Sequence, residues 1–175
     1  DGLFAGASEL RGIAAFLLAL AGLWRSWRIV AMLVIQFFAE DVVHAVEARH
    51  YPAAASAARD LTVAEQVQAG LGAAGRALLA NLLALPFALA LIVTGIGPAL
   101  LFWAVNAALI GRELQDMVWL RHRHQGDGLC PVSRFERFAL GGVVAALLMV
   151  PVANFLAPVL GAAAAAHLVH RKPRI

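Results

Sequence analysis

The segment ALLANLLALPFALALIVTGIGPALLFWAVNAALI, residues 77–110, contains no charged residue and decides the fold class. At about 1.5 Å per helical residue, it is far longer than one crossing of a hydrocarbon core about 30 Å thick requires. Pro86 interrupts the helical hydrogen-bond ladder, and the sequence TGIGP, residues 94–98, is a strong turn signal. We therefore predict a helical hairpin with Gly97 and Pro98 at its tip, buried among other helices.

The flanks of this hairpin, which we assign to residues 77–120, are basic. Arg76 precedes the apolar run, and Arg112 and Arg121 follow it. Because positive flanks favour the cytoplasmic side, both ends of the hairpin are expected there. This expectation holds whether the hairpin spans the membrane or reaches only partway into it.

A second charge-free run, residues 138–166, repeats the pattern near the carboxy terminus. Pro151 and Pro158 interrupt it on either side of Asn154, and each remaining arm has only about a dozen residues, too few for a full span. We predict a re-entrant hairpin over 138–170 with a cytoplasmic carboxy terminus; the alternative is a single kinked spanning helix. Irregular backbone at that depth must be covered by protein or line a wet cavity.

The amino-terminal part is divided into a membrane helix region, 1–39, and an amphipathic connector, 40–76. The arginines near position 25 leave two alternatives for the first region, one long kinked element or two short ones. Within the connector, Thr62 and Glu65 match a capping box and predict the start of a new helix.

Composition supports a membrane-embedded protein. Hydrophobic residues make up 62% of the chain and charged residues 14%, with a mean hydropathy of +0.78, whereas soluble domains carry about 25% charged residues. We predict one all-α domain over 1–175, a polytopic membrane protein with spanning and re-entrant helical hairpins. The formal charge of +3 does not indicate nucleic-acid binding, because no basic face with interleaved aromatic residues occurs.

Three motifs occur in the order known from one family. They are Asp41–Glu47 followed by His50-Tyr51-Pro52, then NAALIGRE at 106–113, and finally Pro151–Gly161 followed by His167 and His170-Arg171. Together they resemble the CysZ-type sulfate permeases of the etoposide-induced-protein domain family. The resemblance implies a bacterial inner-membrane protein, multi-pass and with partly penetrating helices, that takes up sulfate or a similar oxyanion for cysteine synthesis.

Two departures from that family favour an alternative function. Leu114-Gln115-Asp116 replaces the aromatic pair and the acid that usually follow the Gly-Arg-Glu motif. The amino-terminal part is also shortened relative to the family. Of the family's Gly-Leu-Arg anion motif, only a faint resemblance is found, at Leu10-Arg11-Gly12. The alternative is a non-transporting accessory subunit that packs against a larger membrane complex.

An oxyanion site needs fixed donors such as guanidinium groups, amides and helix amino termini. Arg112 is the first candidate, because it ends an apolar run beside Glu113; it either faces a wet interior or pairs with Glu113 at the interface. Asn106 and Arg11 are the further anion-binding candidates. Asn154 is expected to act structurally, in packing between helices.

The histidines are not expected to bind a metal. His122 and His124, like His167 and His170, lie among basic residues with no carboxylate or cysteine at ligand spacing along the chain. No nucleotide-binding motif or nucleophile elbow occurs, so we predict no cofactor and no enzymatic activity. The expected partners are the lipid bilayer and further membrane subunits, with homo-oligomer contacts through small-residue faces at 141–142 and 161–163.

Overall fold

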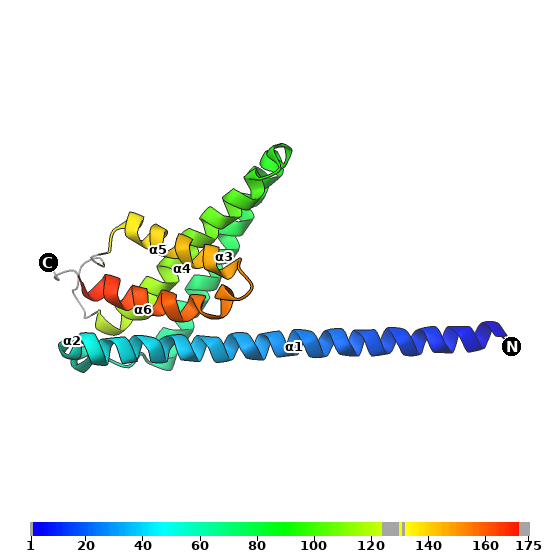
Figure 1. Ribbon diagram of the computed structural model, residues 1–175, viewed down its shortest axis with the longest axis horizontal. Helices are drawn as coiled ribbons and strands as arrows, with labels where there is room; N and C mark the ends of the chain where they lie inside the picture. Colours follow the sequence, from blue (N-terminus) through cyan, green and yellow to red (C-terminus); the bar gives the residue numbers. More distant parts are fainter. Residues whose placement is uncertain (1, 124–129, 131, 172–175) are drawn as a thin grey trace. The chain divides into compact units, whose positions relative to one another are not determined.

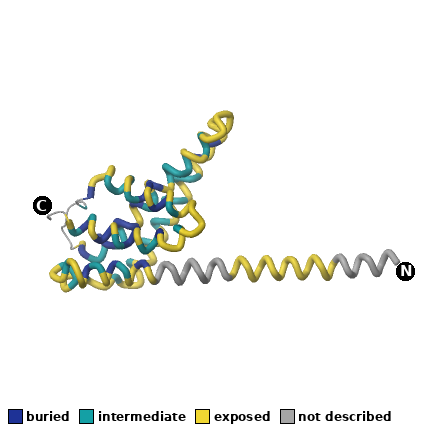
Figure 2. The backbone as a smooth tube through the Cα atoms, in the orientation of Figure 1, coloured by how far each residue is buried: buried dark blue, intermediate teal, exposed yellow. Residues whose placement is uncertain are grey.

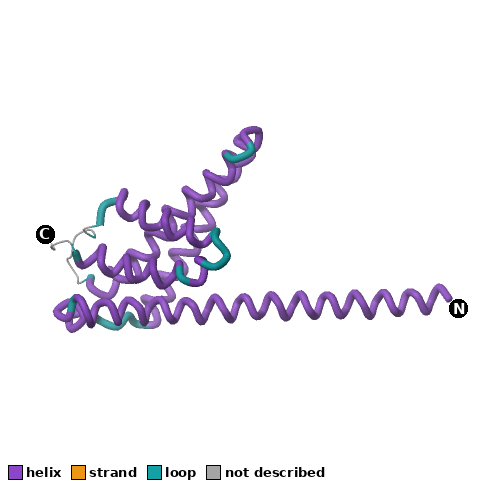
Figure 3. The backbone as a smooth tube through the Cα atoms, viewed as in Figure 1, coloured by secondary structure: helices purple, strands orange, loops and turns teal. Residues whose placement is uncertain are grey.

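The computed structural model describes the backbone of residues 2–123, 130 and 132–171, and side chains within these ranges except at 2–10 and 27–37. Every regular element among the described residues is a helix (Figure 3). The predicted all-α fold class is confirmed. The chain divides into two compact units, one that ends at Phe38 and a second that begins at Ala39.

The first unit is formed by the helix α1, which runs from Gly2 to His50 and continues into the second unit. α1 has no interruption near Arg25, so of the two alternatives for 1–39 the single element is observed. The side chains described in the first unit, those of residues 11–26 and of Phe38, are all exposed. A short helix, α2 (Pro52–Ala57), follows α1.

The predicted first hairpin is present in the second unit, but the prediction that its tip is buried among other helices is wrong, because residues 91–96 are exposed and Gly97 and Pro98 are half-buried. It consists of α3 (Val63–Ala90), the 3-10 helix η1 (Leu91–Thr94) and α4 (Gly97–His122) (Figure 1). The chain reverses at Gly95, whose φ of 72° lies in the left-handed region that favours glycine. The Thr94 hydroxyl then accepts a hydrogen bond from the Gly97 N–H at 2.9 Å, which satisfies one of the free donors at the start of α4.

Two predicted details of this hairpin need correction. Pro86 does not interrupt the first arm, because α3 continues through it to Ala90. A proline removes one backbone donor but leaves the neighbouring turns paired, and such residues are tolerated in helices of apolar surroundings. The second arm is also longer than the apolar run alone indicated, since α4 extends to His122. The predicted capping box at Thr62 and Glu65 is confirmed.

The part of the hairpin next to the chain reversal at Gly95 exposes a continuous apolar surface. Among the described residues, one helical segment, Val63–Thr94, is long and apolar enough to cross a membrane, with a mean hydropathy of 2.3, and only 11% of its most apolar window is buried. Figure 2 shows this exposure along both arms near the tip. Large apolar side chains that face outward include Leu82, Leu83, Phe87, Leu89, Ile92 and Val93.

The second charge-free run, near the carboxy terminus, is also interrupted at the prolines where we predicted a break. α5 (Arg134–Leu148) is followed by the 3-10 helix η2 (Ala153–Phe155) and by α6 (Ala157–His170), with Pro158 in the first turn of α6. α5 and α6 lie side by side and run in opposite directions (Figure 1). A single helix through this region is therefore excluded.

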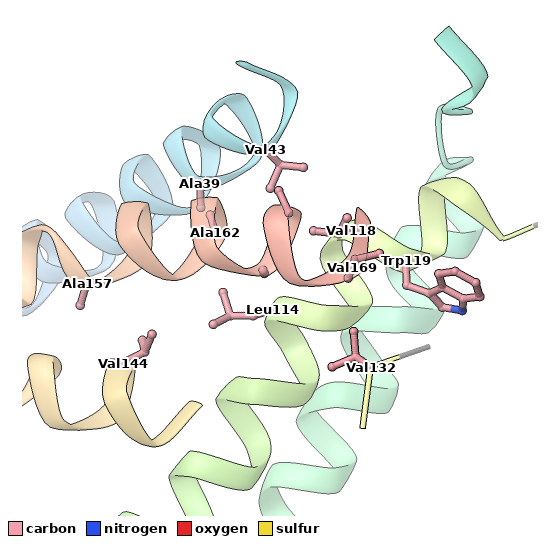
Figure 4. Packing of buried hydrophobic residues seen from close by; sticks show 12 residues of the cluster. Ala39, Val43, Leu114, Val118, Trp119, Val132, Val144, Ala157, Ala162 and Val169 are labelled. Carbon is pink, nitrogen blue, oxygen red and sulfur yellow. The ribbon is translucent and has the colours of Figure 1, made fainter. Parts of the chain in front are cut away.

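Small residues let the helices of the second unit approach closely. Gly141 in α5 faces the Ala107 carbonyl of α4, Gly111 faces the Arg137 carbonyl, and Gly161 in α6 contacts Val144 and Leu114. The small residues at 141–142 and 161–162 are thus buried between helices of the same chain, and Ala163 is half-buried; homo-oligomer formation stays a prediction. The core around them joins α1, α4, α5 and α6 (Figure 4) and includes Val43, Leu114, Val118, Val144, Ala162 and Val169.

Candidate functional site: a buried glutamate and two histidines

Three helices of the second unit bring their carboxy-terminal ends to the same place. α1 ends at His50, α4 at His122 and α6 at His170, and Figure 1 shows these ends together beside α2. Helix carboxy termini carry partial negative charge and favour cationic groups. The last turns accordingly hold basic side chains, among them Arg121 and the histidines at 50, 122, 167 and 170.

Glu47 is the centre of this cluster. Its side chain is 1% exposed, and the side chains of His122 and His170 are 0% and 6% exposed. The oxygen Oε1 of Glu47 lies 2.8 Å from His122 Nε2 and 2.9 Å from His170 Nε2. One carboxylate oxygen of Glu47 is therefore hydrogen-bonded to two imidazole rings, each from a different helix.

The second carboxylate oxygen of Glu47 is held by Arg121. Arg121 Nη1 donates to Glu47 Oε2 at 3.3 Å, and Arg121 Nη2 lies 3.3 Å from His44 Nδ1. Arg121 is also tied to the segment between α2 and α3, because its carbonyl accepts the Arg59 N–H at 3.0 Å. These contacts fix the orientation of the Glu47 carboxylate from both sides.

The surroundings keep Glu47 ionised. Burial by itself raises the pKa of a carboxyl group, but the hydrogen bonds from His122 and His170 and the positive charge of Arg121 outweigh it. The pKa of Glu47 falls from 4.5 to about 2 as a result. A buried carboxylate of this kind is stable only because it is fully paired.

A layer of aromatic side chains borders the cluster. The Tyr51 hydroxyl lies 2.9 Å from His167 Nδ1, and the Tyr51 ring lies 5.1 Å from the His170 ring. The rings of His122 and His170 meet edge to face at 4.7 Å between centroids. A groove of about 500 Å³ opens beside this layer, and its lining includes His50, Tyr51 and His170.

The residues predicted to bind an anion lie elsewhere. Arg112 Nε is 3.6 Å from Asp116 Oδ2, one helical turn further along α4, and Arg76 Nη2 of α3 is 3.5 Å from the same oxygen. Glu113, the partner of Arg112 in one of the two predicted alternatives, is exposed. The ion pair that Arg112 forms is with Asp116.

The other predicted residues of the second unit are not brought together with Arg112. The Asn106 amide donates to the Phe102 carbonyl within α4 at 2.8 Å. Gly97 and Pro98 begin α4, fifteen residues before Arg112, which is about 22 Å along a helix. Pro151 and Asn154 lie in the turn between α5 and α6, with Pro158 just after it. Arg11 lies in the first unit.

The cluster of Glu47, His122 and His170 was not predicted from the sequence, because no local sequence pattern links the three residues. Glu47 is separated from His122 by 75 residues and from His170 by 123, whereas a carboxylate was sought close to the histidines in sequence. Of the two histidines in the 122–124 pair, His122 lies in the cluster and His124 lies outside the described residues. The only available signal was that Glu47 belongs to the first motif of the family resemblance and His170 to the last.

Comparison with known proteins identifies the family. Neither a curated protein nor a solved structure matches the chain. One family model does match, and it covers residues 3–158, which is most of the 175-residue chain. The chain therefore belongs to the family described as sulfate transporter CysZ/Etoposide-induced protein 2.4.

Proposed function

We propose that this chain is a multi-pass protein of the bacterial inner membrane that passes sulfate or a similar oxyanion. Its family membership supports transport, since the family description names a sulfate transporter. The exposed apolar surface of α3 and η1 supports residence in lipid, because an apolar patch of this extent is otherwise found at interfaces.

The lengths of the helices support two depths of insertion. Val63–Thr94 is long enough to cross the hydrocarbon core. α5 has 15 residues and α6 has 14, which is about 22 Å of helix each and less than the roughly 30 Å core. These lengths support a partly penetrating α5–α6 hairpin that packs against α4.

The observation that carries the proposal is the pairing of two arginines with one acid, partway along the two arms of the first hairpin. Arg76 of α3 and Arg112 of α4 share Asp116, and their side chains are 35% and 48% exposed. Guanidinium groups are suited to oxyanions because their donors form a fixed fork. An incoming dianion can take the place of Asp116 between them.

The basic residues beside the two hairpins indicate how the protein is oriented in the membrane in this proposal. Arg76 and Arg112 flank the charge-free run of the first hairpin, Arg121 lies in the last turn of α4, and Arg171 follows the second hairpin. The positive-inside rule places these ends, and with them the carboxy terminus, in the cytoplasm. The arginine pair would then receive or release the anion on the cytoplasmic side.

Uptake of labelled sulfate into vesicles that contain the purified protein tests the proposal. We expect uptake above that of empty vesicles, a loss of at least about tenfold for Arg112→Ala, and little change for Arg134→Ala. Arg134 is an exposed arginine in the first turn of α5, so it controls for loss of a positive charge. Absence of uptake by the wild-type protein would remove the transport proposal.

A second candidate is a non-transporting subunit of a larger membrane complex. It is supported by the segment that departs from the family motif, since Leu114 and Gln115 are both buried in the helix bundle. These residues fill the interior and do not line a path. This candidate predicts no sulfate uptake, together with a defined larger assembly when native membranes are solubilised in mild detergent.

A further inference from the structure

We propose that Glu47, His122 and His170 form a binding site for one divalent transition metal ion of the Zn²⁺ class. The three residues come from α1, α4 and α6, and their candidate ligand atoms all lie within 4.8 Å of one another. Imidazole nitrogens and a carboxylate oxygen are the ligand set of zinc sites with two histidines and one acid. This site is separate from the arginine pair, and the inference does not depend on sulfate transport.

The distances are close to those that a bound ion requires. Zinc bonds of about 2.0–2.2 Å in tetrahedral geometry place neighbouring ligand atoms about 3.3 Å apart. The nitrogens of His122 and His170 lie 2.8 and 2.9 Å from Glu47 Oε1. Each contact would lengthen by about half an ångström, within reach of small side-chain rotations. The ring hydrogens now directed at Oε1 would then reside on Nδ1.

Arg121 is placed to hold one of the three ligands in position without binding the ion itself. Arg121 engages Glu47 Oε2, which leaves Oε1 as the single ligand oxygen. Partners of this kind orient first-shell ligands and tune the affinity of the ion. The positive charge of Arg121 opposes a dication, whereas the three converging helix ends favour one. We therefore expect an affinity below that of closed structural zinc sites.

The groove at His50 and Tyr51 lies beside the proposed site. His170 both lines this groove and contacts Glu47, so one of the three ligands borders an open space. Three protein ligands with one open position is the arrangement of zinc sites that exchange water or substrate. The alternative explanation of the same contacts is a purely hydrogen-bonded network of a carboxylate and two imidazoles.

Titration with Co²⁺ distinguishes these two explanations. The full chain would be purified in detergent with a tag that contains no histidine, stripped with chelator, and titrated with Co²⁺ while its visible absorption is recorded. We expect a saturable absorption change at one equivalent per chain. Zn²⁺ should then abolish it by displacing Co²⁺, because zinc binds such ligand sets more tightly.

Variants assign the signal to the cluster. His170→Ala and Glu47→Gln should each weaken Co²⁺ binding at least about a hundredfold, since removal of an outer-shell partner alone costs about 10–100-fold. His167→Ala is the matched control, because His167 is on the same helix but contacts Tyr51 and His50. Far-ultraviolet circular dichroism would establish that each variant is folded.

Two results would overturn the proposal. One is the absence of any stoichiometric Co²⁺ or Zn²⁺ binding by the wild-type chain, a measurement that needs no variant. The other is equal affinity of Glu47→Gln and His167→Ala for the ion. Glu47→Gln preserves the shape of the side chain, so it keeps the test decisive if His170→Ala does not fold.

Discussion

His170 Nε2 lies 2.9 Å from Glu47 Oε1, although 123 residues separate the two. The contact joins the end of α6 to the end of α1, and His122 joins α4 to the same oxygen. The carboxylate is therefore the common point at which three helices of the second unit are held together. Its removal leaves several buried donors without an acceptor, which is costly at low dielectric.

Glu47→Ala is expected to destabilise the second unit by roughly 3–5 kcal/mol, the cost of breaking a buried charge pair. Glu40→Ala is the control, since Glu40 is exposed on the same helix. Chemical denaturation in detergent, followed by circular dichroism with chelator present, measures both variants. Equal unfolding free energies for the two would show that the contacts at Glu47 contribute little.

The parts of the fold that the sequence predicted are those encoded by neighbouring residues. The capping box at Thr62 needs only a partner three residues away, and the chain reversals follow from glycine and proline at 95–98 and 151–158. Local steric and hydrogen-bonding rules suffice for these features.

The candidate site could not be predicted in the same way. Whether Glu47 faces His122 or solvent depends on how α1, α4 and α6 pack, and no short-range pattern specifies that. The same applies to Gly141, whose role as a close-contact residue becomes visible only when Ala107 of α4 is placed against it. Sequence therefore predicted the elements, and tertiary packing determined the site.

Gly141→Ala tests the close packing of α4 and α5. A Cβ atom at Gly141 meets the Ala107 carbonyl oxygen, a backbone atom that cannot rotate away. We expect destabilisation of about 1–3 kcal/mol or more from overpacking. Gly70→Ala, in the exposed part of α3 with open space around its Cβ position, should instead stabilise by about 0.5–1 kcal/mol.

Denaturation of the two glycine variants side by side gives the comparison. The two substitutions add the same methyl group inside a helix, so their opposite signs report the surroundings alone. Stabilisation by Gly141→Ala would contradict the observed contact between α4 and α5.

Ser133→Ala tests the start of α5. The Ser133 hydroxyl accepts the Glu136 N–H at 3.2 Å, and the Glu136 carboxylate accepts the Ser133 N–H at 2.9 Å. Loss of the hydroxyl removes half of this capping box and should cost about 1 kcal/mol. Ser133→Thr keeps the acceptor and should stay close to wild type, as measured by thermal unfolding in detergent.

Asp116→Asn tests the competition between an anion and Asp116 for the two arginines. Neutralising the side chain removes an acceptor charge that lies 3.5 Å from Arg76 and 3.6 Å from Arg112, so both guanidinium groups become more available to a dianion. In the vesicle assay, the KM for sulfate should fall by a few fold, whereas Arg76→Ala should raise it. Arg59→Ala serves as the control, because Arg59, in the segment before α3, pairs with Glu65 of α3 at 2.8 Å and not with Asp116. A raised KM for Asp116→Asn in a folded protein would mean that Asp116 supports anion binding, for example by orienting Arg112, and would contradict competition at this site.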